Sequence, residues 1–398
     1  MEQIPQIPNP LLELHQSVDA DMQSFGSIEI VSTFGQPQLE YAALHKSCGI
    51  MDLPFRGALL FTGRDRCSFL NGLISNQTWD KETKQPMPAG GGVYSFLLNL
   101  KGRIVADMRV IELGDVAMMI ADVTLIESLK DVFDKYLFAE QVKMQSAVGV
   151  WHPFLLIGPK AREVLAAVAG EGGKLSDVKA GRLAIDGVEV VVFEDNLNDA
   201  PAACLLVPTD SAVAIWTRLT AEGAEGAPLA RGVGWAAFNA RRIEAGHALC
   251  GIDFAVVSPA TAYPARKLRE AATTPAEETG PGVLPAETGA LFRRAVSLSK
   301  CYVGQEIVAR MHARQQVPRM LAGFKMLDDS LPIAGSPVFD AEQNQIGIVT
   351  SSTVSPVRGN ASIGFAFLKK PHFAPGTKLT IPAEGSMRTA TVVELPLA

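Results

Sequence analysis

The chain has 398 residues, of which 47% are hydrophobic and 20% charged, and its formal net charge at pH 7 is −6. This length allows two or three domains with a sizeable core, and the composition is that of a soluble globular protein. The acidic balance excludes a protein that coats nucleic acid, because neutralising phosphates needs a surplus of Lys and Arg.

The cysteines and the N-terminus indicate the compartment. Five cysteines are spread over the sequence, and no CxxC pair occurs. We therefore expect neither a disulfide framework nor a metal site, and a reducing environment. The first residues lack the basic and apolar regions of a signal peptide, and no stretch has the ~20 apolar residues that cross a bilayer. These features predict a cytoplasmic protein without a membrane partner.

Strand and helix patterns mix through the first two thirds of the chain. Residues 1–24 are rich in Pro and Gln and predict a flexible arm. Apolar runs predict strands at 57–63, 93–99, 103–113, 116–121 and 154–157, with a hairpin turn at 100–102. Helical spacing predicts helices after a capping box of Thr124 and Glu127, and at 161–170, 211–219 and about 235–245.

From residue 271 onward the sequence has a different pattern. Residues 271–286 are small, acidic and interrupted by Pro and Gly, which predicts an inserted loop. From residue 321, short apolar runs alternate with Gly and Pro turns, as in a small β-barrel. We therefore expect an α+β protein with an arm at 1–24, an α+β region at 25–320 and a barrel at 321–398.

Residues 297–319 gather the most chemistry-bearing side chains. The segment reads SLSKCYVGQEIVARMHARQQVPR, with a cysteine, an aromatic residue, a glycine, an amide and a carboxylate within six residues. Lys300 and Arg310 would favour a thiolate at Cys301, and Gly304 would let the backbone approach a ligand closely. The alternative is a buried structural cysteine beside a turn.

The surrounding window, residues 291–320, is strongly basic. Six Lys or Arg residues stand against Glu306 alone, a net charge of +5 within a chain of −6. Such an island predicts a site for an anion: a polyglutamyl tail, a phosphate or an RNA backbone. The alternative is a solvated helix face.

Two other residues are weaker candidates. His312 follows Cys301 by eleven residues, and a continuous helix would separate them by more than ~10 Å, which argues against a Cys–His pair. Asp107 follows the predicted hairpin turn on a strand. It is either a catalytic carboxylate or an ordinary hairpin charge.

Several segments resemble one known family. CYVGQE at 301–306 is similar to the signature of the folate-binding YgfZ proteins, which assist iron–sulfur enzymes and are related to the glycine cleavage T protein, an aminomethyltransferase. Further blocks resemble the family in the same order, at 44–76, 98–110, 241–253, 284–289 and 335–356.

The differences from the T protein favour the YgfZ branch. T proteins carry two adjacent aspartates where this chain has Ala106 and Asp107, and an aspartate in place of Cys301. Their acidic stretch that holds the pterin corresponds to Asp199-Ala200-Pro201. The chain also departs from the YgfZ pattern, because the usual Lys-Gly before the cysteine is Ser299-Lys300.

The resemblance implies three subdomains around a central cleft that holds tetrahydrofolate, with a C-terminal β-barrel. It implies a reduced-folate-binding protein that assists the biogenesis or repair of iron–sulfur proteins, including tRNA-modifying enzymes. Its partners would be iron–sulfur client or assembly proteins. The alternative is a folate-dependent aminomethyltransferase or another one-carbon transferase.

The resemblance also implies the site residues. Cys301 and Asp107 are the expected catalytic residues, and no metal ligand is expected. The expected folate-binding residues are Tyr302, Gly304, Gln305, Glu306, Arg310 and Arg242. Tyr302 would stack on a pterin or aminobenzoate ring. In the transferase alternative, Asp107 is the base and Glu306 a positioner.

Overall fold

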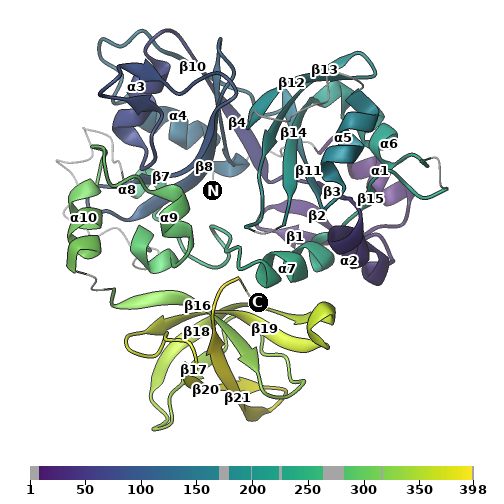
Figure 1. Cartoon of the computed structure of the whole chain (residues 1–398), viewed down its shortest axis with the longest axis vertical. Coiled ribbons are helices and arrows are strands. Elements are labelled where there is room, and N and C mark those ends of the chain that lie inside the picture. The colour runs from purple at the N-terminus through teal and green to yellow at the C-terminus, as the bar shows by residue number, and fades with distance from the viewer. Residues whose placement is uncertain are drawn as a thin grey trace. The chain divides into compact units, whose positions relative to one another are not determined.

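The computed structural model describes residues 9–169, 179–198, 200–223, 226–262, 282–314 and 317–396. The chain divides into two compact units, and Figure 1 labels their helices and strands. Unit 1 comprises Met1–Phe69, Thr78–Val93 and Met108–Phe238, and unit 2 comprises Leu70–Gln77, Tyr94–Asp107 and Asn239–Ala398. The expected boundary at residue 320 is therefore not a boundary between these units, because residues before it belong to the same unit as the barrel.

Some elements continue from one unit into the other along the chain: α3 (Arg66–Leu73), β7 (Gly92–Leu98), β8 (Ile104–Glu112) and α7 (Trp235–Glu244). The helices within unit 1 are α1 (Leu12–Ser17), α2 (Pro37–Lys46), α4 (Ile126–Asp134), α5 (Ala161–Ala169) and α6 (Ala212–Thr220). Its strands are β1 (Asp21–Phe25), β2 (Ile28–Thr33), β3 (Gly49–Asp52), β4 (Arg56–Thr62), β5 (Trp79–Asp80), β6 (Gln85–Pro86), β9 (Ala117–Asp122), β10 (Lys143–Ser146), β11 (Trp151–Ile157), β12 (Ala180–Ile185), β13 (Val188–Glu194), β14 (Ala202–Pro208) and β15 (Arg231–Gly232).

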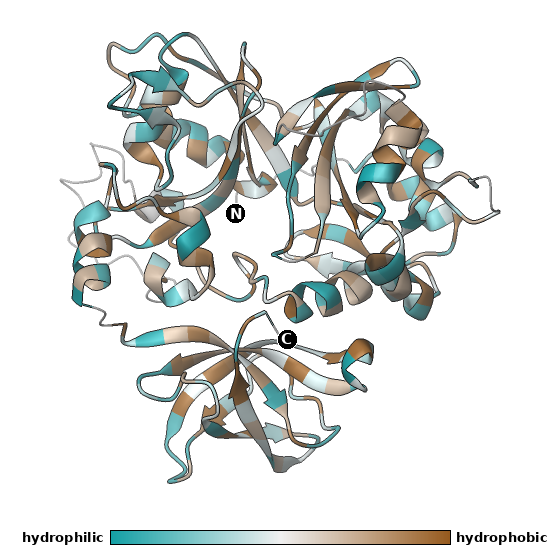
Figure 2. Ribbon diagram, in the orientation of Figure 1, coloured by the Kyte–Doolittle hydropathy of each residue, from teal (hydrophilic) through white to brown (hydrophobic). Residues whose placement is uncertain are grey.

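A six-stranded sheet with the order β12-β13-β14-β11-β3-β15 forms the larger core of unit 1. Its two central strands, β11 and β14, are largely hydrophobic along their length, as Figure 2 shows. α5 and α6 pack on this sheet because their apolar residues recur every three or four positions. The buried positions on α6, for example, are Ala212, Ile215, Trp216 and Leu219. The strand predicted at 154–157 and the helices predicted at 161–170 and 211–219 are confirmed as β11, α5 and α6, whereas the other strands of this sheet were not predicted.

The N-terminal arm predicted for residues 1–24 is wrong for residues 9–24, since α1 and β1 occupy most of that range. Residues 1–8 lie outside the described residues. His15 is fully buried, and its Nε2 lies 3.0 Å from Asp52 Oδ2. Asp52 also accepts a hydrogen bond from the Asn9 amide and lies 2.5 Å from His152 Nε2. A buried carboxylate thus anchors the segment.

The second large sheet has the order β10-β4-β9-β8-β7. β4, β7, β8 and β9 match the predicted runs, whereas β10 was not predicted. The predicted hairpin is confirmed as β7 and β8. The predicted capping box is wrong. The Thr124 hydroxyl donates to the Asp122 carboxylate, which also accepts the backbone N–H of Thr124. A 3-10 turn at Val123–Leu125 (η1) precedes α4, whose N-cap residue makes no side-chain hydrogen bond. Asp122 ends the preceding strand, so the cap lies two residues earlier than expected.

Unit 2 contains short helices and the predicted C-terminal barrel. The helices are α8 (Pro259–Ala262), α9 (Leu291–Ala295) and α10 (Gln305–Arg314), with 3-10 turns η5 (Pro285–Thr288) and η6 (Pro356–Arg358). The closed barrel has the order β16-β19-β18-β17-β20-β21. Its strands are β16 (Arg319–Met326), β17 (Pro337–Phe339), β18 (Gln345–Ser355), β19 (Ala361–Lys369), β20 (Lys378–Ala383) and β21 (Ser386–Val393). Of the predicted loop at 271–286, residues 271–281 lie outside the described residues.

A buried ion pair connects α7 to the barrel within unit 2. The Arg242 guanidinium donates to Asp253 Oδ2 at 2.7 Å and to Ser351 Oγ at 2.8 Å. Ser351 follows a register shift in β18, and both it and Thr350 donate to Asp253 Oδ1. The bulge therefore turns consecutive side chains toward one carboxylate. Because both side chains are fully buried, removing either one would leave the other as an unpaired buried charge.

Two tight turns interlock beside the hairpin. Gly304, with φ +81°, lies directly against the β7–β8 turn, where an added Cβ would be 3.1 Å from Gly102 Cα and closer still to Asn99 O. Gly102, with φ +70°, faces Ile307 in return. The close approach expected of Gly304 is thus made to the protein's own backbone.

We predict that Gly304→Ala destabilises the protein by about 3 kcal/mol, from the sum of backbone strain and overpacking. Gly359→Ala is the matched control. Gly359 has φ +68° with nothing within 4 Å of an added Cβ, so it should cost only about 1 kcal/mol. Chemical denaturation measures both. Equal losses in the two variants would show that the interlock is not tight.

We also predict that Asp52→Asn lowers the free energy of unfolding by roughly 3 kcal/mol, because it removes the buried charge and replaces one of the two oxygens that face Asn9, His15 and His152 with an NH2 group. Burial alone would raise the pKa of Asp52, but the charge of His152 and hydrogen bonds from both histidines hold that pKa well below its usual range. The stabilisation is therefore present above the unfolded pKa of about 3.9 and is lost as the pH falls below it.

Denaturation curves between neutral and acidic pH test this prediction. The exposed Asp210 provides the control, and Asp210→Asn should change stability by less than about 0.5 kcal/mol. The prediction is wrong if Asp52→Asn is as stable as the wild type at neutral pH.

Candidate functional site

A carboxylate and a phenol meet on the hairpin within unit 2. Asp107 on β8 is 6% exposed and accepts a hydrogen bond of 3.1 Å from the Tyr94 hydroxyl on β7. Tyr94 is 9% exposed, and its ring packs edge-on against Phe96. Phe96 in turn contacts Phe254 edge-on. The predicted carboxylate is therefore held in an aromatic environment rather than exposed as an ordinary hairpin charge.

The segment that contains α9 is hydrogen-bonded to this hairpin. The Asn76 side-chain amide donates to the carbonyls of Tyr94 and Arg294, at 2.8 and 2.9 Å. The Ser75 hydroxyl donates to Ala295 O at 2.6 Å. These bonds place the Arg294 guanidinium over the Tyr94 ring, 5.6 Å from its centroid. A cation, a phenol and a carboxylate thereby form one cluster.

Lys300 has a different role from the one predicted. Its ammonium is buried and donates to the carbonyls of Ile74 and Asn76, at 2.6 and 2.8 Å. It also lies 5.5 Å from the centroid of the Tyr302 ring. The charge expected to activate Cys301 therefore fixes the backbone of this segment.

The residues after Cys301 form a turn and the start of α10. Tyr302 is buried, and burial raises the pKa of its hydroxyl to about 12. The Gln305 side chain accepts the backbone N–H of Tyr302 at 3.1 Å, so its carbonyl closes the turn. Glu306 is exposed and pairs with Arg310 at 2.8 Å. Folate contacts by these residues stay predictions.

Arg242 lies elsewhere in unit 2. Its side chain is fully buried, and its donors reach Asp253, Ser351, Asn239 and the carbonyl of His247. These contacts are structural, and a folate contact by Arg242 also stays a prediction. The structure thus brings Asp107 near Tyr94 and Arg294, and places the predicted residues 301–310 on the adjoining turn and helix.

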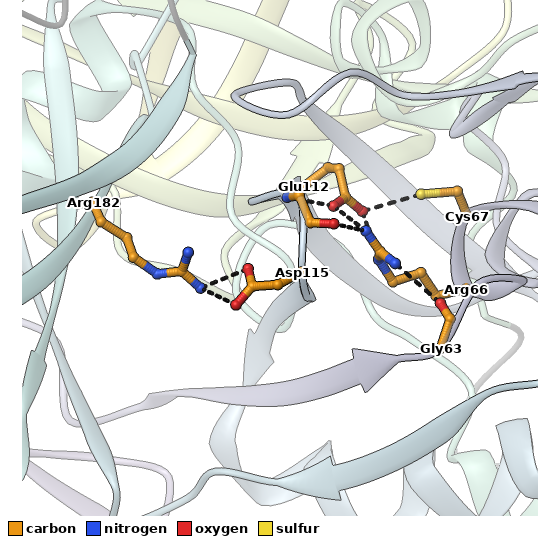
Figure 3. A network of polar contacts seen from close by, with 7 residues as sticks. Gly63, Arg66, Cys67, Glu112, Asp115 and Arg182 are labelled. Carbon is orange, nitrogen blue, oxygen red and sulfur yellow. Dashed lines mark hydrogen bonds and ion pairs between the residues drawn. The ribbon is translucent and has the colours of Figure 1, made fainter.

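Cys301 is exposed, whereas Cys48, Cys67 and Cys204 are buried and Cys250 is half-buried. Figure 3 shows why Cys67 is held in place: its thiol donates to Glu112, which also binds the Arg66 guanidinium at 2.6 Å. Burial, followed by this hydrogen bond, raises the pKa of Cys67 to about 12. Burial likewise raises the pKa of Cys48 to about 12. Cys301 is therefore the accessible thiol.

Sequence reasoning missed Tyr94 and Arg294. Tyr94 lies in the predicted strand 93–99, and pairing that strand with 103–113 would have brought it toward Asp107. No local pattern connects Arg294 to either residue. Among the described residues, no group of His, Cys, Asp and Glu side chains is arranged to hold a metal ion. No described helix is both long and apolar enough to cross a membrane.

Comparison with known proteins identifies the family. The probable aminomethyltransferases of Thermococcus gammatolerans and Pyrococcus horikoshii are 25% and 26% identical over 97% of this chain and 95% of theirs. The crystal structure of glycine cleavage system aminomethyltransferase T from Bartonella henselae has a TM-score of 0.76 at 20% identity, covering 98% of this chain and 97% of that one, and shows the same fold. Residues 11–262 match the GCVT N-terminal domain, and residues 319–398 match the glycine cleavage T-protein C-terminal barrel domain. The match to the GCVT N-terminal domain alone covers more than half of the chain, so the chain belongs to the glycine cleavage T-protein family.

Proposed function

We propose that this protein binds a reduced folate and transfers a one-carbon group between that folate and a second substrate. The curated relatives that match almost the whole chain are named aminomethyltransferases. This supports the transferase that the sequence suggested as the alternative to an iron–sulfur role. The observation that carries the proposal is the buried Asp107 carboxylate beside the Tyr94 hydroxyl.

The Asp107 cluster has the chemistry that such a transfer requires. When a folate nitrogen gains a one-carbon group, an N–C bond replaces an N–H bond, and the proton passes to a base as the leaving group departs. A carboxylate held by a phenol can accept that proton or orient the N–H. The Arg294 guanidinium over Tyr94 adds a positive charge nearby. Reduced folate would supply the nucleophilic nitrogen, so these residues fit the ligand.

Ala106 does not count as strongly against a transferase as the sequence suggested. Ala106 and Asp107 are consecutive residues of β8, so their side chains point to opposite faces of the sheet. A carboxylate at position 106 would lie on the other face, at a position where Ala106 is 1% exposed. The absence of that acid therefore leaves the Asp107 cluster intact.

We predict that Asp107→Asn lowers kcat/KM for one-carbon transfer by about 10²-fold or more, because the amide cannot accept a proton. Tyr94→Phe should lower it by about tenfold, since it removes one hydrogen bond to the carboxylate. Calorimetry with tetrahydrofolate and a transfer assay with an aminomethylated carrier protein measure binding and turnover.

The control is Asp115→Asn, because Asp115 belongs to unit 1, is largely exposed and pairs with Arg182 (Figure 3). Full activity of Asp107→Asn would remove Asp107 from the mechanism. A wild type that neither binds tetrahydrofolate nor turns over would refute the proposal itself.

A second function is favoured by Cys301. An exposed thiol on the turn before α10 could exchange with a partner thiol or transiently hold sulfur. We therefore propose, as the alternative, the YgfZ-like role: folate-dependent assistance to iron–sulfur client or assembly proteins, including tRNA-modifying enzymes. One cysteine cannot hold a cluster alone, so the isolated protein would carry no stable cluster.

We predict that Cys301 reacts first with a thiol reagent at neutral pH, since thiols with a pKa near 12 are almost entirely protonated. Cys301→Ser should remove the fast phase and keep folate binding. If the YgfZ-like role is correct, the variant also fails to restore iron–sulfur enzyme activity in a strain that lacks the gene. Cys48→Ser is the control for buried thiols. Full complementation by Cys301→Ser contradicts that role, and faster labelling of Cys250 contradicts the reactivity.

A further inference from the structure

The position of Arg294 relative to Tyr94 is set by backbone hydrogen bonds within unit 2. One side-chain amide, that of Asn76, donates to the carbonyls of both Tyr94 and Arg294, at 2.8 and 2.9 Å. The Ser75 hydroxyl holds the next residue of α9, Ala295, by its carbonyl at 2.6 Å. These bonds use no atom of the Arg294 side chain, so a substitution of that side chain leaves them in place.

The Arg294 guanidinium and the Asp107 carboxylate contact two parts of the same phenol. The guanidinium lies over the Tyr94 ring, 5.6 Å from its centroid, and the hydroxyl of that ring donates to Asp107 at 3.1 Å. Tyr94 and Asp107 are buried, and Arg294 is half-buried. Water therefore screens the interactions among these three groups less than it would at the surface.

A cation over a phenol acts on the hydroxyl as well as on the ring. The positive charge is attracted to the face of the ring, which fixes the position of the side chain. It also stabilises negative charge on the phenol oxygen, which makes the O–H group a stronger hydrogen-bond donor. A stronger donor in turn favours the charged form of the carboxylate that accepts it. Arg294 can therefore influence Asp107 through the Tyr94 hydroxyl.

Further cations on or beside the hairpin have other surroundings. Lys101 at the hairpin tip is exposed, so its charge is screened by solvent. Three more cations have partners of their own: Arg109 binds Asp195, whereas Arg103 and Lys300 donate to backbone carbonyls. Arg109 lies two residues after Asp107 on β8 and hence on the same face of the strand. A substitution of Arg294 leaves these charges in place, so it isolates the effect of one guanidinium.

We propose that Arg294 is a positioning residue of the candidate site, which acts on Asp107 through the Tyr94 hydroxyl. The inference rests on the proposed function, since it assigns a further residue to the same reaction. The hydroxyl, strengthened as a donor, keeps the Asp107 carboxylate charged and holds it in one direction. Without the guanidinium, the carboxylate is held less firmly and serves as a base over a narrower range of pH.

The test is the pH dependence of kcat/KM for one-carbon transfer, measured for the wild type, Arg294→Gln and Arg294→Lys. Arg294→Gln should lower kcat/KM about fivefold at neutral pH, mostly through kcat, because the carboxylate is less well oriented. The acid limb of its profile should also move to higher pH by about half a unit, since the charged carboxylate is less stabilised. Arg294→Lys keeps the positive charge and should keep the acid limb of the wild type.

A double-mutant cycle with Tyr94→Phe shows whether the effect passes through the hydroxyl. In the Tyr94→Phe background, Arg294→Gln should leave kcat/KM and the acid limb nearly unchanged, because the donor that the guanidinium strengthens is absent. Arg293→Gln is the matched control. Arg293 precedes Arg294 on α9 and is exposed, so its pH profile should equal that of the wild type.

The possible outcomes separate the inference from the proposed function. An acid limb that does not move in Arg294→Gln overturns the inference and leaves the proposed function standing. So does a shift of equal size in the Tyr94→Phe background, or a shift that also occurs in Arg294→Lys. Unfolding of both Arg294 variants, seen by circular dichroism, would show a structural role and overturn the inference as well. A wild type without turnover refutes the proposed function itself.

Discussion

The interlock of two glycine turns determines where the candidate site lies in unit 2. Gly304 rests against the backbone of Asn99 and Gly102, and Gly102 rests against Ile307, so a side chain at either glycine would press on the other turn. One turn ends the strand pair that carries Tyr94 and Asp107. The other precedes α10 and carries Cys301. A side chain at either glycine would push the two segments apart. The hydrogen bonds that connect residues 74–76 with residues 294–300 would then lose their present geometry.

This arrangement explains the basic residue beside Cys301. In the sequence, Lys300 suggested an activated thiol, because a neighbouring cation stabilises a thiolate. In the structure, its ammonium is buried against two carbonyls and an aromatic ring. A lysine with a long apolar stem can bury that stem while its charge finds oxygen acceptors. Accessibility, rather than a neighbouring charge, is what distinguishes Cys301 from the other cysteines.

The elements that depend on local patterns could be predicted from the sequence. The hairpin of β7 and β8, the helix α6 and the barrel all follow from apolar periodicity and turn residues. Asp107 could be named as a candidate because it lies on the strand that follows the hairpin turn, and its catalytic role stays a prediction. Arg294 could not be found, since its contact with Tyr94 joins residues 200 positions apart. The prediction of a flexible arm was wrong at residues 9–24 for the same reason. The contact between His15 and Asp52 joins distant parts of the sequence, and the Pro and Gln composition of the segment gave no sign of it.

The candidate site keeps its charges away from solvent, and this determines what the site can do. Asp107 is almost fully buried and held by a phenol, so its interactions are little screened by salt and can act on one bond of a substrate. Arg294 is half-buried over the same phenol, so its positive charge is screened less than that of a fully exposed arginine.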